Sequence, residues 1–408
     1  MEPYPKPFLT IQEYDVQESF IQVLKNRFRQ YGFNQVKTPA FETYDLYSSV
    51  QGTIALDDMI KFISPEGKVL VLRPDVTIPI TQLAVSQNDE FEKEARYSYI
   101  LDVFRTSFQA KYGYVKTQAG VELLGNPHAE ADMEVISLAI DCLLDLEFTN
   151  FKIEMGHAGV VNEILQMLSL SKEQEDQFKQ LIISKNFTGL EEFLSRLDIE
   201  PSMKESLLTI PLLYGKPDVV LDKALSLSLT NKMTSALHRL KEVFSMLAEY
   251  GFRDYIVVDL GLISSMSYYS DITFQGYIEN IGKPVLFGGR YDNLAEQFAS
   301  PIPAIGFAYD VDTLLSARPN PLPVREQVVI RFDEQNVAVA IQLAKRLREL
   351  HYQTILSNRN EGASGTYVIT ITKSNKTVMY EGETEPFNSE EQLLQRLQSL
   401  KEENTCNR

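Results

Sequence analysis

Residues 262–294 read LISSMSYYSDITFQGYIENIGKPVLFGGRYDNL, and this stretch decides the fold of a chain of 408 residues. Paired tyrosines, Tyr268 and Tyr269, precede an apolar run at 272–277, and a turn rich in Gly, Asn and Pro leads to a second run at 285–287. Aromatic and β-branched residues between turn formers predict two antiparallel strands. Taken alone, the paired glycines 288–289 favour a glycine turn at a sheet edge, although they also allow close approach to a ligand or to a neighbouring strand.

The composition is that of an ordinary globular protein, with 44% hydrophobic and 23% charged residues, and its length predicts two or three domains. A net charge of −17 argues against a nucleic-acid partner, although an acidic chain can carry a local basic patch. Two cysteines form neither a disulfide framework nor a zinc cluster, and no apolar stretch reaches membrane-spanning length. We therefore expect a cytoplasmic protein with no metal, no cofactor, and neither nucleic acid nor membrane as a partner.

The N-terminal part of the chain predicts one helix followed by short strands. Apolar residues recur at helical spacing over residues 12–31, and Gly32 ends that helix. Residues 33–42 then predict a strand that Pro39 interrupts. Residues 59–72 predict two strands joined by a Pro-Glu-Gly turn.

Two later strands carry polar residues at informative positions. The strand predicted at 97–105 ends in Arg105, and the strand predicted at 117–125 carries Gln118 and Glu122. The two-residue period of a strand puts Gln118 and Glu122 on one face, which can be either a site or an exposed sheet surface. The amphipathic helix expected at 129–146 has acids in its first turn, Asp132 among them, and we interpret them as helix-start residues rather than metal ligands.

Changes of composition divide the chain. Residues 160–250 are rich in Leu, Glu, Lys and Ser at helical spacing and predict a helical insertion in a first domain, residues 1–318. A proline-rich linker at 318–325 follows. Beyond the linker, a β-α-β pattern and further strands predict a small C-terminal α/β domain, residues 325–408.

Several motifs in the same order resemble the histidyl-tRNA synthetase family, which belongs to the class II aminoacyl-tRNA synthetases. They are YYSDITFQGY with GGRYDNL, LRPDVTIPI at 72–80, the strand–loop–strand at 97–125, and Gly306-Phe307-Ala308. The resemblance covers about residues 12–315 and implies an α+β fold with an antiparallel sheet flanked by helices. It also implies that the segment 12–42, which resembles motif 1 of the family, builds a dimer.

The resemblance implies a histidine-binding pocket. In the family, the positions of Asp75 and Thr77 bind the amino group, the position of Arg105 meets a carboxylate or phosphate, and the other matching positions line the pocket. The full expected set is Asp75, Thr77, Arg105, Gln118, Glu122, Tyr268, Tyr269 and Tyr291. Asp75 and Thr77 could also cap the helix that begins near Ile78, and the two roles are compatible.

The sequence departs from the family where ATP is handled. The family's arginine before the tyrosine pair is Ser264 here, the arginine of motif 3 is Thr313, and the loop after Arg105 lacks the family's R-x-E pattern. This combination resembles the regulatory subunits of ATP phosphoribosyltransferase. It implies a protein without catalytic residues that assembles with a short-form catalytic subunit in a hetero-octamer and senses L-histidine for feedback. An active histidyl-tRNA synthetase, or a histidine-binding paralogue with another partner, remains an alternative.

Overall fold

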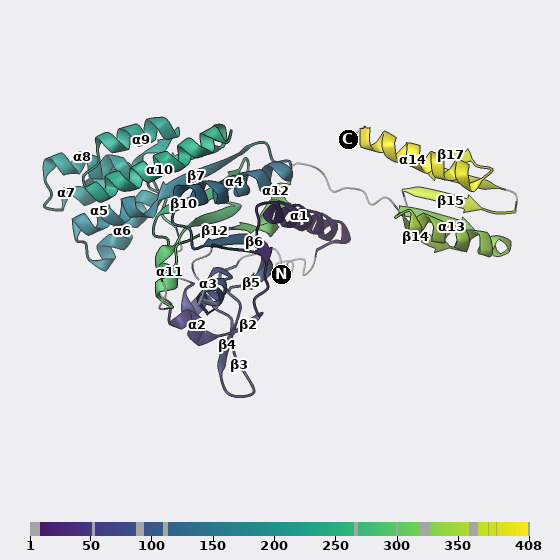
Figure 1. The fold of residues 1–408 in the computed structure, drawn as a ribbon, viewed down its shortest axis with the longest axis horizontal. Helices are drawn as coiled ribbons and strands as arrows, with labels where there is room; N and C mark the ends of the chain where they lie inside the picture. Colours follow the sequence, from purple (N-terminus) through teal and green to yellow (C-terminus); the bar gives the residue numbers. More distant parts are fainter. Residues whose placement is uncertain are drawn as a thin grey trace, which may run out of the picture. The chain divides into compact units, whose positions relative to one another are not determined.

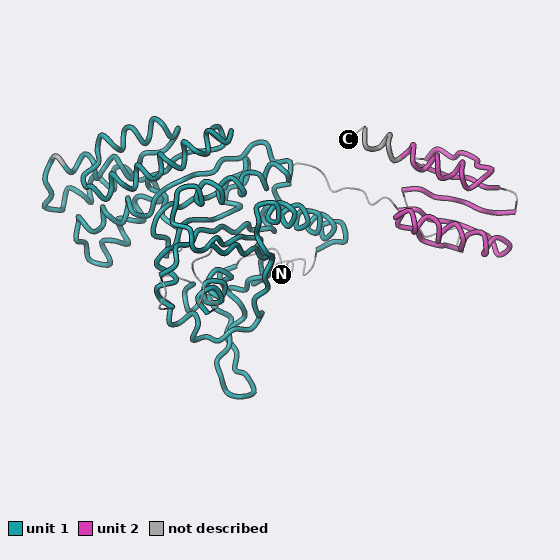
Figure 2. The backbone as a smooth tube through the Cα atoms, viewed as in Figure 1, with its two compact units in different colours: residues 1–321 teal, residues 322–408 magenta. Residues whose placement is uncertain are grey.

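The computed structural model describes residues 9–50, 54–86, 94–108, 113–264, 268–298, 301–318, 327–358, 366–373, 375–380 and 382–406. The chain forms two compact units, Met1–Pro321 and Leu322–Arg408 (Figures 1 and 2). Apart from Arg318, the linker predicted at 318–325 lies outside the described residues. No described helix combines the length and apolar character that crossing a membrane requires.

A nine-stranded sheet organises the first unit, in the order β1-β5-β6-β12-β11-β10-β7-β9-β8. Neighbouring strands are antiparallel except for the parallel pairs β1–β5 and β7–β9. The predicted class II synthetase-like α+β fold is confirmed, with these two parallel pairs as an addition. The strands are β1 (Asn34–Gln35), β5 (Ala95–Phe104), β6 (Val115–Leu124), β7 (Phe151–His157), β8 (Tyr214–Gly215), β9 (Ile256–Asp259), β10 (Ile272–Ile278), β11 (Leu286–Arg290) and β12 (Ala304–Asp310).

Among the helices that pack on the sheet are α1 (Ile11–Gln30), α4 (Ala129–Asp145) and α12 (Val311–Ala317). Thr10 begins α1 with a capping box in which Glu13 is the partner, which satisfies backbone donors at the helix start. The apolar stripe of α1 faces the sheet, where Phe28 meets Phe307 of β12 edge to face at 6.2 Å. This packing holds β12, in the interior of the sheet, against the N-terminal helix.

The range predicted as a helical insertion lies in sequence between β7 and β9. Figure 1 shows its helices gathered at one side of the first unit. The range holds α5 (Ala158–Leu168), α6 (Lys172–Ile183), α7 (Phe187–Ser195), α8 (Pro201–Thr209), α9 (Pro217–Ser226) and α10 (Asn231–Glu249), with 3-10 turns at Ile210–Leu212 and Arg253–Tyr255. Buried residues of these helices, such as Phe178 and Leu237, belong to the same hydrophobic core as the sheet. The helices are therefore packed into the first unit rather than attached as a separate body.

A small sheet in the order β2-β4-β3 carries the segment that leads to Asp75. Its strands are β2 (Phe41–Thr43), β3 (Lys61–Ile63) and β4 (Val69–Leu72), followed by α3 (Thr77–Ser86), with α2 (Tyr44–Ser48) and a 3-10 turn at Leu56–Asp58 between β2 and β3. Arg73 ties this sheet to the large one, because its Nε donates to the Asp102 carbonyl at 3.0 Å. The amide of Phe104, the last residue of β5, donates to the Arg73 carbonyl at 3.0 Å. This hydrogen bond holds the segment that leads to Asp75 against β5.

The second unit has its own core. Its sheet runs in the order β14-β13-β15-β16-β17, with β13 (Gln327–Phe332), β14 (Gln353–Ser357), β15 (Tyr367–Ile371), β16 (Lys376–Tyr380) and β17 (Glu383–Pro386). The predicted β-α-β unit is β13, α13 (Val337–Glu349) and β14, in which the two strands are parallel. Leu343 of α13 and Leu397 of α14 (Glu390–Cys406) pack with Ile330 and Ile369 of the sheet.

The structure corrects the interpretation of the glycine pair. Gly288 and Gly289 lie within β11, which pairs with β10 on one side and β12 on the other, so a glycine turn at a sheet edge is wrong. A Cβ on Gly288 would lie 2.7 Å from the Phe307 Cβ, and one on Gly289 would lie 2.8 Å from the Tyr269 ring. The alternative, close approach of neighbouring chain segments, explains the pair.

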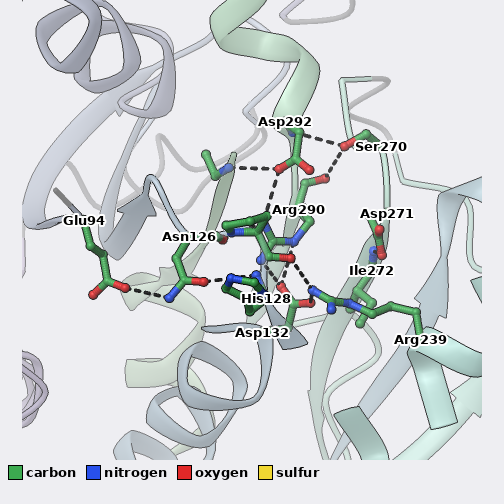
Figure 3. A network of polar contacts seen from close by, with 12 residues as sticks. Glu94, Asn126, His128, Asp132, Arg239, Ser270, Asp271, Ile272, Arg290 and Asp292 are labelled. Atoms are coloured by element: carbon green, nitrogen blue, oxygen red, sulfur yellow. Dashed lines mark hydrogen bonds and ion pairs between the residues drawn. The ribbon is translucent and has the colours of Figure 1, made fainter. Parts of the chain in front are cut away.

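The GGRYD arginine is held by an ion cluster that the sequence did not predict (Figure 3). Asp132, in the first turn of α4, has a fully buried side chain. Its Oδ1 accepts hydrogen bonds from Arg290 Nε at 2.8 Å and from Arg290 Nη2 at 2.5 Å, and its Oδ2 accepts one from Arg239 of α10 at 2.6 Å. Asp132 is therefore more than a helix-start residue, because it joins α4, α10 and the end of β11.

Replacing Asp132 with Ala should destabilise the first unit strongly. The change leaves the Arg290 guanidinium, whose side chain is 1% exposed, without its closest counter-charge. Removing one partner of a buried ion pair costs about 3–5 kcal/mol, to be measured as the free energy of unfolding in urea. Asp218→Ala is the matched control, because the Asp218–Arg253 pair is more than half exposed and should contribute less than about 1 kcal/mol. Equal losses in the two variants would contradict the prediction.

Candidate functional site

A cavity of about 230 Å³ brings all the predicted site residues together. Its walls come from β5, β6, β11 and β12, from the segment before α3, and from the paired tyrosines. The lining includes Asp75, Thr77, Arg105, Gln118, Glu122, Tyr268, Tyr269 and Tyr291, and also Tyr99, Phe108, Lys116, Ser264, Phe287, Gly306, Phe307, Ala308 and Asp310. The alternative of an exposed polar sheet face for Gln118 and Glu122 is therefore wrong.

Glu122 of β6 is the most deeply buried acid of the cavity, with 2% of its surface exposed. Its Oε1 accepts a hydrogen bond from the Thr77 hydroxyl at 2.7 Å, and its Oε2 accepts one from the Tyr291 hydroxyl. Opposite it in β12 stands Gly306, where any Cβ would overlap the carboxylate. Burial raises the pKa of Glu122 to about 8, against the lowering effect of the hydrogen bonds from Tyr291 and Thr77. At neutral pH the protonated form of Glu122 is therefore favoured.

Asp75 precedes α3 and is 5% exposed. Its Oδ1 accepts a hydrogen bond from the Ile78 amide at 2.9 Å, so the predicted capping role is present. The Thr77 hydroxyl donates to Glu122 instead, and in this structure it does not serve as a cap. Burial raises the pKa of Asp75, and the Arg105 guanidinium, 4.0 Å from Asp75 Oδ2, opposes that shift.

Arg105 follows β5 and is oriented by the chain before α3. Its Nε donates to the Pro74 carbonyl at 2.8 Å, and its guanidinium lies 5.2 Å from the Phe108 ring centre. Burial lowers the pKa of Arg105, but an arginine remains a cation throughout the physiological range. The cavity therefore offers one fixed guanidinium beside one buried carboxylate, which suits a ligand with both an anionic and a cationic group.

Aromatic rings form the remaining wall. Tyr268 meets Tyr269 edge to face at 4.9 Å and Tyr291 at 5.7 Å. Tyr99 of β5 also lines the cavity and was not predicted from the sequence, although Gly120 pointed to it. Gly120 stands between Gln118 and Glu122 on the same strand face, and a Cβ there would lie 2.6 Å from the Tyr99 ring. The glycine thus leaves room for the Tyr99 side chain.

An ion pair in the cavity was not predicted from the sequence. Lys116 Nζ lies 2.7 Å from Asp310 Oδ2 and 4.8 Å from the Phe108 ring centre. Lys116 precedes Gln118 by two residues in β6, so the two-residue strand period could have placed it on the site face. Asp310 also begins α12, because its Oδ1 accepts a hydrogen bond from the Thr313 amide at 2.9 Å.

The two positions that depart from the family differ in their surroundings. Ser264 lines the cavity, whereas Thr313 is not part of the lining and is 2% exposed within α12. The residues 265–267 next to Ser264 lie outside the described part of the chain. Among the described residues, no group of His, Cys, Asp and Glu has the arrangement of a metal site.

The fold and this cavity define a protein of the histidyl-tRNA synthetase type. The histidyl-tRNA synthetase family model matches residues 8–314. A histidyl-tRNA synthetase from Nostoc sp. PCC 7120 has the same fold, with a TM-score of 0.80, 18% identity, and 97% of this chain and 99% of that chain covered.

A more specific relationship appears in sequence. A regulatory subunit of ATP phosphoribosyltransferase from Oceanobacillus iheyensis is 42% identical over 86% of each chain, and one from Ruminiclostridium cellulolyticum is 34% identical over 80% of this chain and 79% of its own length. A Bacillus halodurans structure described as an ATP phosphoribosyltransferase regulatory subunit/histidyl-tRNA synthetase superposes with a TM-score of 0.81 at 29% identity, covering 91% of this chain and 98% of that chain. This chain belongs to the family of ATP phosphoribosyltransferase regulatory subunits.

Replacing Tyr291 with Phe should raise the pKa of Glu122 above its value of about 8. The tyrosine hydroxyl donates to the carboxylate and stabilises its ionised form, so its loss favours the protonated form. An NMR titration of ¹³C-labelled glutamate carboxyl groups measures the shift.

Tyr309→Phe is the control for that titration. It also removes a buried tyrosine hydroxyl, but one that donates to the Ala139 carbonyl instead of to Glu122. A pKa of Glu122 that stays unchanged in Tyr291→Phe, or that moves equally in both variants, would show that the Tyr291 contact does not control this carboxylate.

Proposed function

We propose that this chain is the regulatory subunit of an ATP phosphoribosyltransferase, required with a short-form catalytic subunit for the first step of histidine biosynthesis and for feedback inhibition by histidine. The observation that supports this proposal most strongly has two parts. The cavity contains all the residues expected to bind an amino acid, and Ser264 and Thr313 occupy the positions where the family has arginines. The names of the relatives support the same function.

The proposed ligand of the cavity is L-histidine. Asp75 would accept the ammonium group, with Gln118 beside it, and Arg105 would face the carboxylate as a planar fork. Glu122 and the Tyr291 hydroxyl would meet the imidazole, whose two nitrogens need one acceptor and one donor when the ring is neutral. Tyr268 and Tyr269 would cover the ring and exclude water.

The proposed assembly is a hetero-octamer with the catalytic subunit, in which two copies of this chain pair through the motif 1-like segment. That segment comprises α1 and β1, and β1 is an edge strand of the large sheet. Tyr14 of α1 is 52% exposed, as an interface residue can be in a single chain. An active synthetase is the second candidate, and the missing arginines weigh against it because adenylate formation needs fixed positive charge at the phosphates.

Co-expression with a short-form catalytic subunit tests the function. We expect the two chains to co-purify, and the release of pyrophosphate in the reaction of ATP with phosphoribosyl pyrophosphate to require both. Purified alone, this chain should show no histidine-dependent exchange of pyrophosphate into ATP, because neither Ser264 nor Thr313 supplies a cation. Robust exchange by the chain alone, with no effect on the catalytic subunit, would favour the synthetase instead.

The affinity for histidine should peak between about pH 6.5 and about pH 8. The imidazole of free histidine has a pKa of about 6.5, and the pKa of Glu122 without a ligand is about 8. Between these values Glu122 already carries the single proton that the carboxylate and the ring share. Below this window the imidazole of free histidine is protonated, so one proton must be released before histidine and Glu122 can share a single proton. Above it Glu122 is ionised and a proton must be taken up, so both limits weaken binding.

Calorimetry from about pH 5 to about pH 9 measures this profile. Glu122→Gln should weaken binding roughly ten- to a hundredfold, as expected for one buried charge-assisted hydrogen bond. In this variant the fall of affinity at high pH that is due to ionisation of Glu122 should disappear. The fall that is due to deprotonation of the amino group of histidine should remain. Thr77, Tyr99, Asp75 and Tyr291 surround the carboxylate and are unchanged in this comparison. Identical profiles for wild type and variant would place the imidazole elsewhere.

A further inference from the structure

We propose that the cavity contains a second subsite, for an anionic group, at Lys116, and that the carboxylate of Asp310 occupies it and keeps phosphate-bearing ligands out. The proposal rests on the proposed function in one respect, namely that the rest of the cavity takes an amino acid. Asp310 would then be a specificity-determining residue, because it restricts the cavity to ligands without a phosphate group.

Lys116 has the surroundings of an anion-binding group. Its side chain is 23% exposed and lines the cavity together with Arg105 and Phe108. Both cations approach the same aromatic ring, Lys116 Nζ at 4.8 Å and the Arg105 guanidinium at 5.2 Å from its centre. Two cations beside one ring form a wall at which a phosphate or pyrophosphate group would be attracted.

Asp310 cancels that attraction. Its Oδ2 lies 2.7 Å from Lys116 Nζ, whereas Asp75 lies 4.0 Å from the nearer nitrogen of Arg105, so the lysine is the more closely neutralised of the two cations. Asp75 and Asp310 together set two carboxylates against the two cations of the cavity. A ligand that carries several negative charges meets like charge there, and rejection of this kind is a recognised route to specificity.

The backbone keeps Asp310 in this position. Asp310 is the last residue of β12 and the N-cap of α12, and its Oδ1 accepts a hydrogen bond from the Thr313 amide at 2.9 Å. One carboxylate oxygen is thereby fixed by the helix start, which leaves the other directed at Lys116. Asn and Ser also serve well as N-caps, so either can replace Asp310 without loss of the cap.

The experiment measures binding of inorganic pyrophosphate and of ATP, each without metal, by calorimetry. Wild type should bind both weakly. Asp310→Asn should bind both roughly ten- to a hundredfold more tightly, as expected when a charged hydrogen-bond donor becomes available. The gain should disappear in the double variant Asp310→Asn/Lys116→Met. Asp310→Ser provides a second form of the same test should the asparagine variant fold poorly.

Asp312→Asn is the matched control. Asp312 is also a partly buried acid near Lys116, but its carboxylate accepts hydrogen bonds from the Thr117 amide and from Gln17, and it does not line the cavity. We expect Asp312→Asn to bind pyrophosphate as wild type does. Equal gains in Asp310→Asn and Asp312→Asn, or a gain that survives the Lys116 change, would overturn the proposal.

Binding of L-histidine to the same proteins separates the two proposals. Wild type that binds histidine, together with no gain for pyrophosphate in either Asp310 variant, would overturn the subsite alone. A gain for pyrophosphate in a protein that binds no histidine would overturn the proposed ligand and leave the subsite standing.

Discussion

The interaction on which the rest of the site depends is the burial of Glu122 among hydroxyl groups. Thr77 and Tyr291 donate to its two oxygens, and the backbone of Gly306 leaves the space that the carboxylate fills. An isolated carboxylate is expensive to bury, and its pKa rises in consequence. A ligand that donates a hydrogen bond from a nitrogen would stabilise the ionised form of Glu122, which burial disfavours. Part of the binding free energy would then come from relieving this destabilisation.

This arrangement demands a rigid scaffold. Tyr291 stands at the end of β11, directly after Arg290, and the ion cluster of Arg290, Asp132 and Arg239 holds that end against α4 and α10. Ser270, beside the paired tyrosines, joins the same region because its amide donates to the Arg290 carbonyl at 2.9 Å. The ion cluster of the interior therefore fixes the tyrosines around Glu122, which forms no ion pair with any described residue.

Local patterns predicted most of the fold, and the resemblance to the family's motifs implied the eight residues that share the cavity. Gln118 and Glu122 illustrate why, since the two-residue strand period fixes their common face whatever the strand pairs with. The misses depended on contacts between distant segments. The Lys116–Asp310 pair joins β6 to β12, the buried state of Asp132 depends on Arg290 and Arg239, and the glycine pair could be placed inside the sheet only once the neighbours of β11 were known.

A crystal structure of the protein with L-histidine tests the account most directly. We predict an imidazole nitrogen within hydrogen-bond distance of Glu122, about 2.7–3.2 Å, with the amino group at Asp75 and the carboxylate at Arg105. Histidine bound at another place on the chain, or turned so that its carboxylate faces Lys116 and its ring lies away from Glu122, would contradict the proposed role of the buried glutamate as the partner of the imidazole.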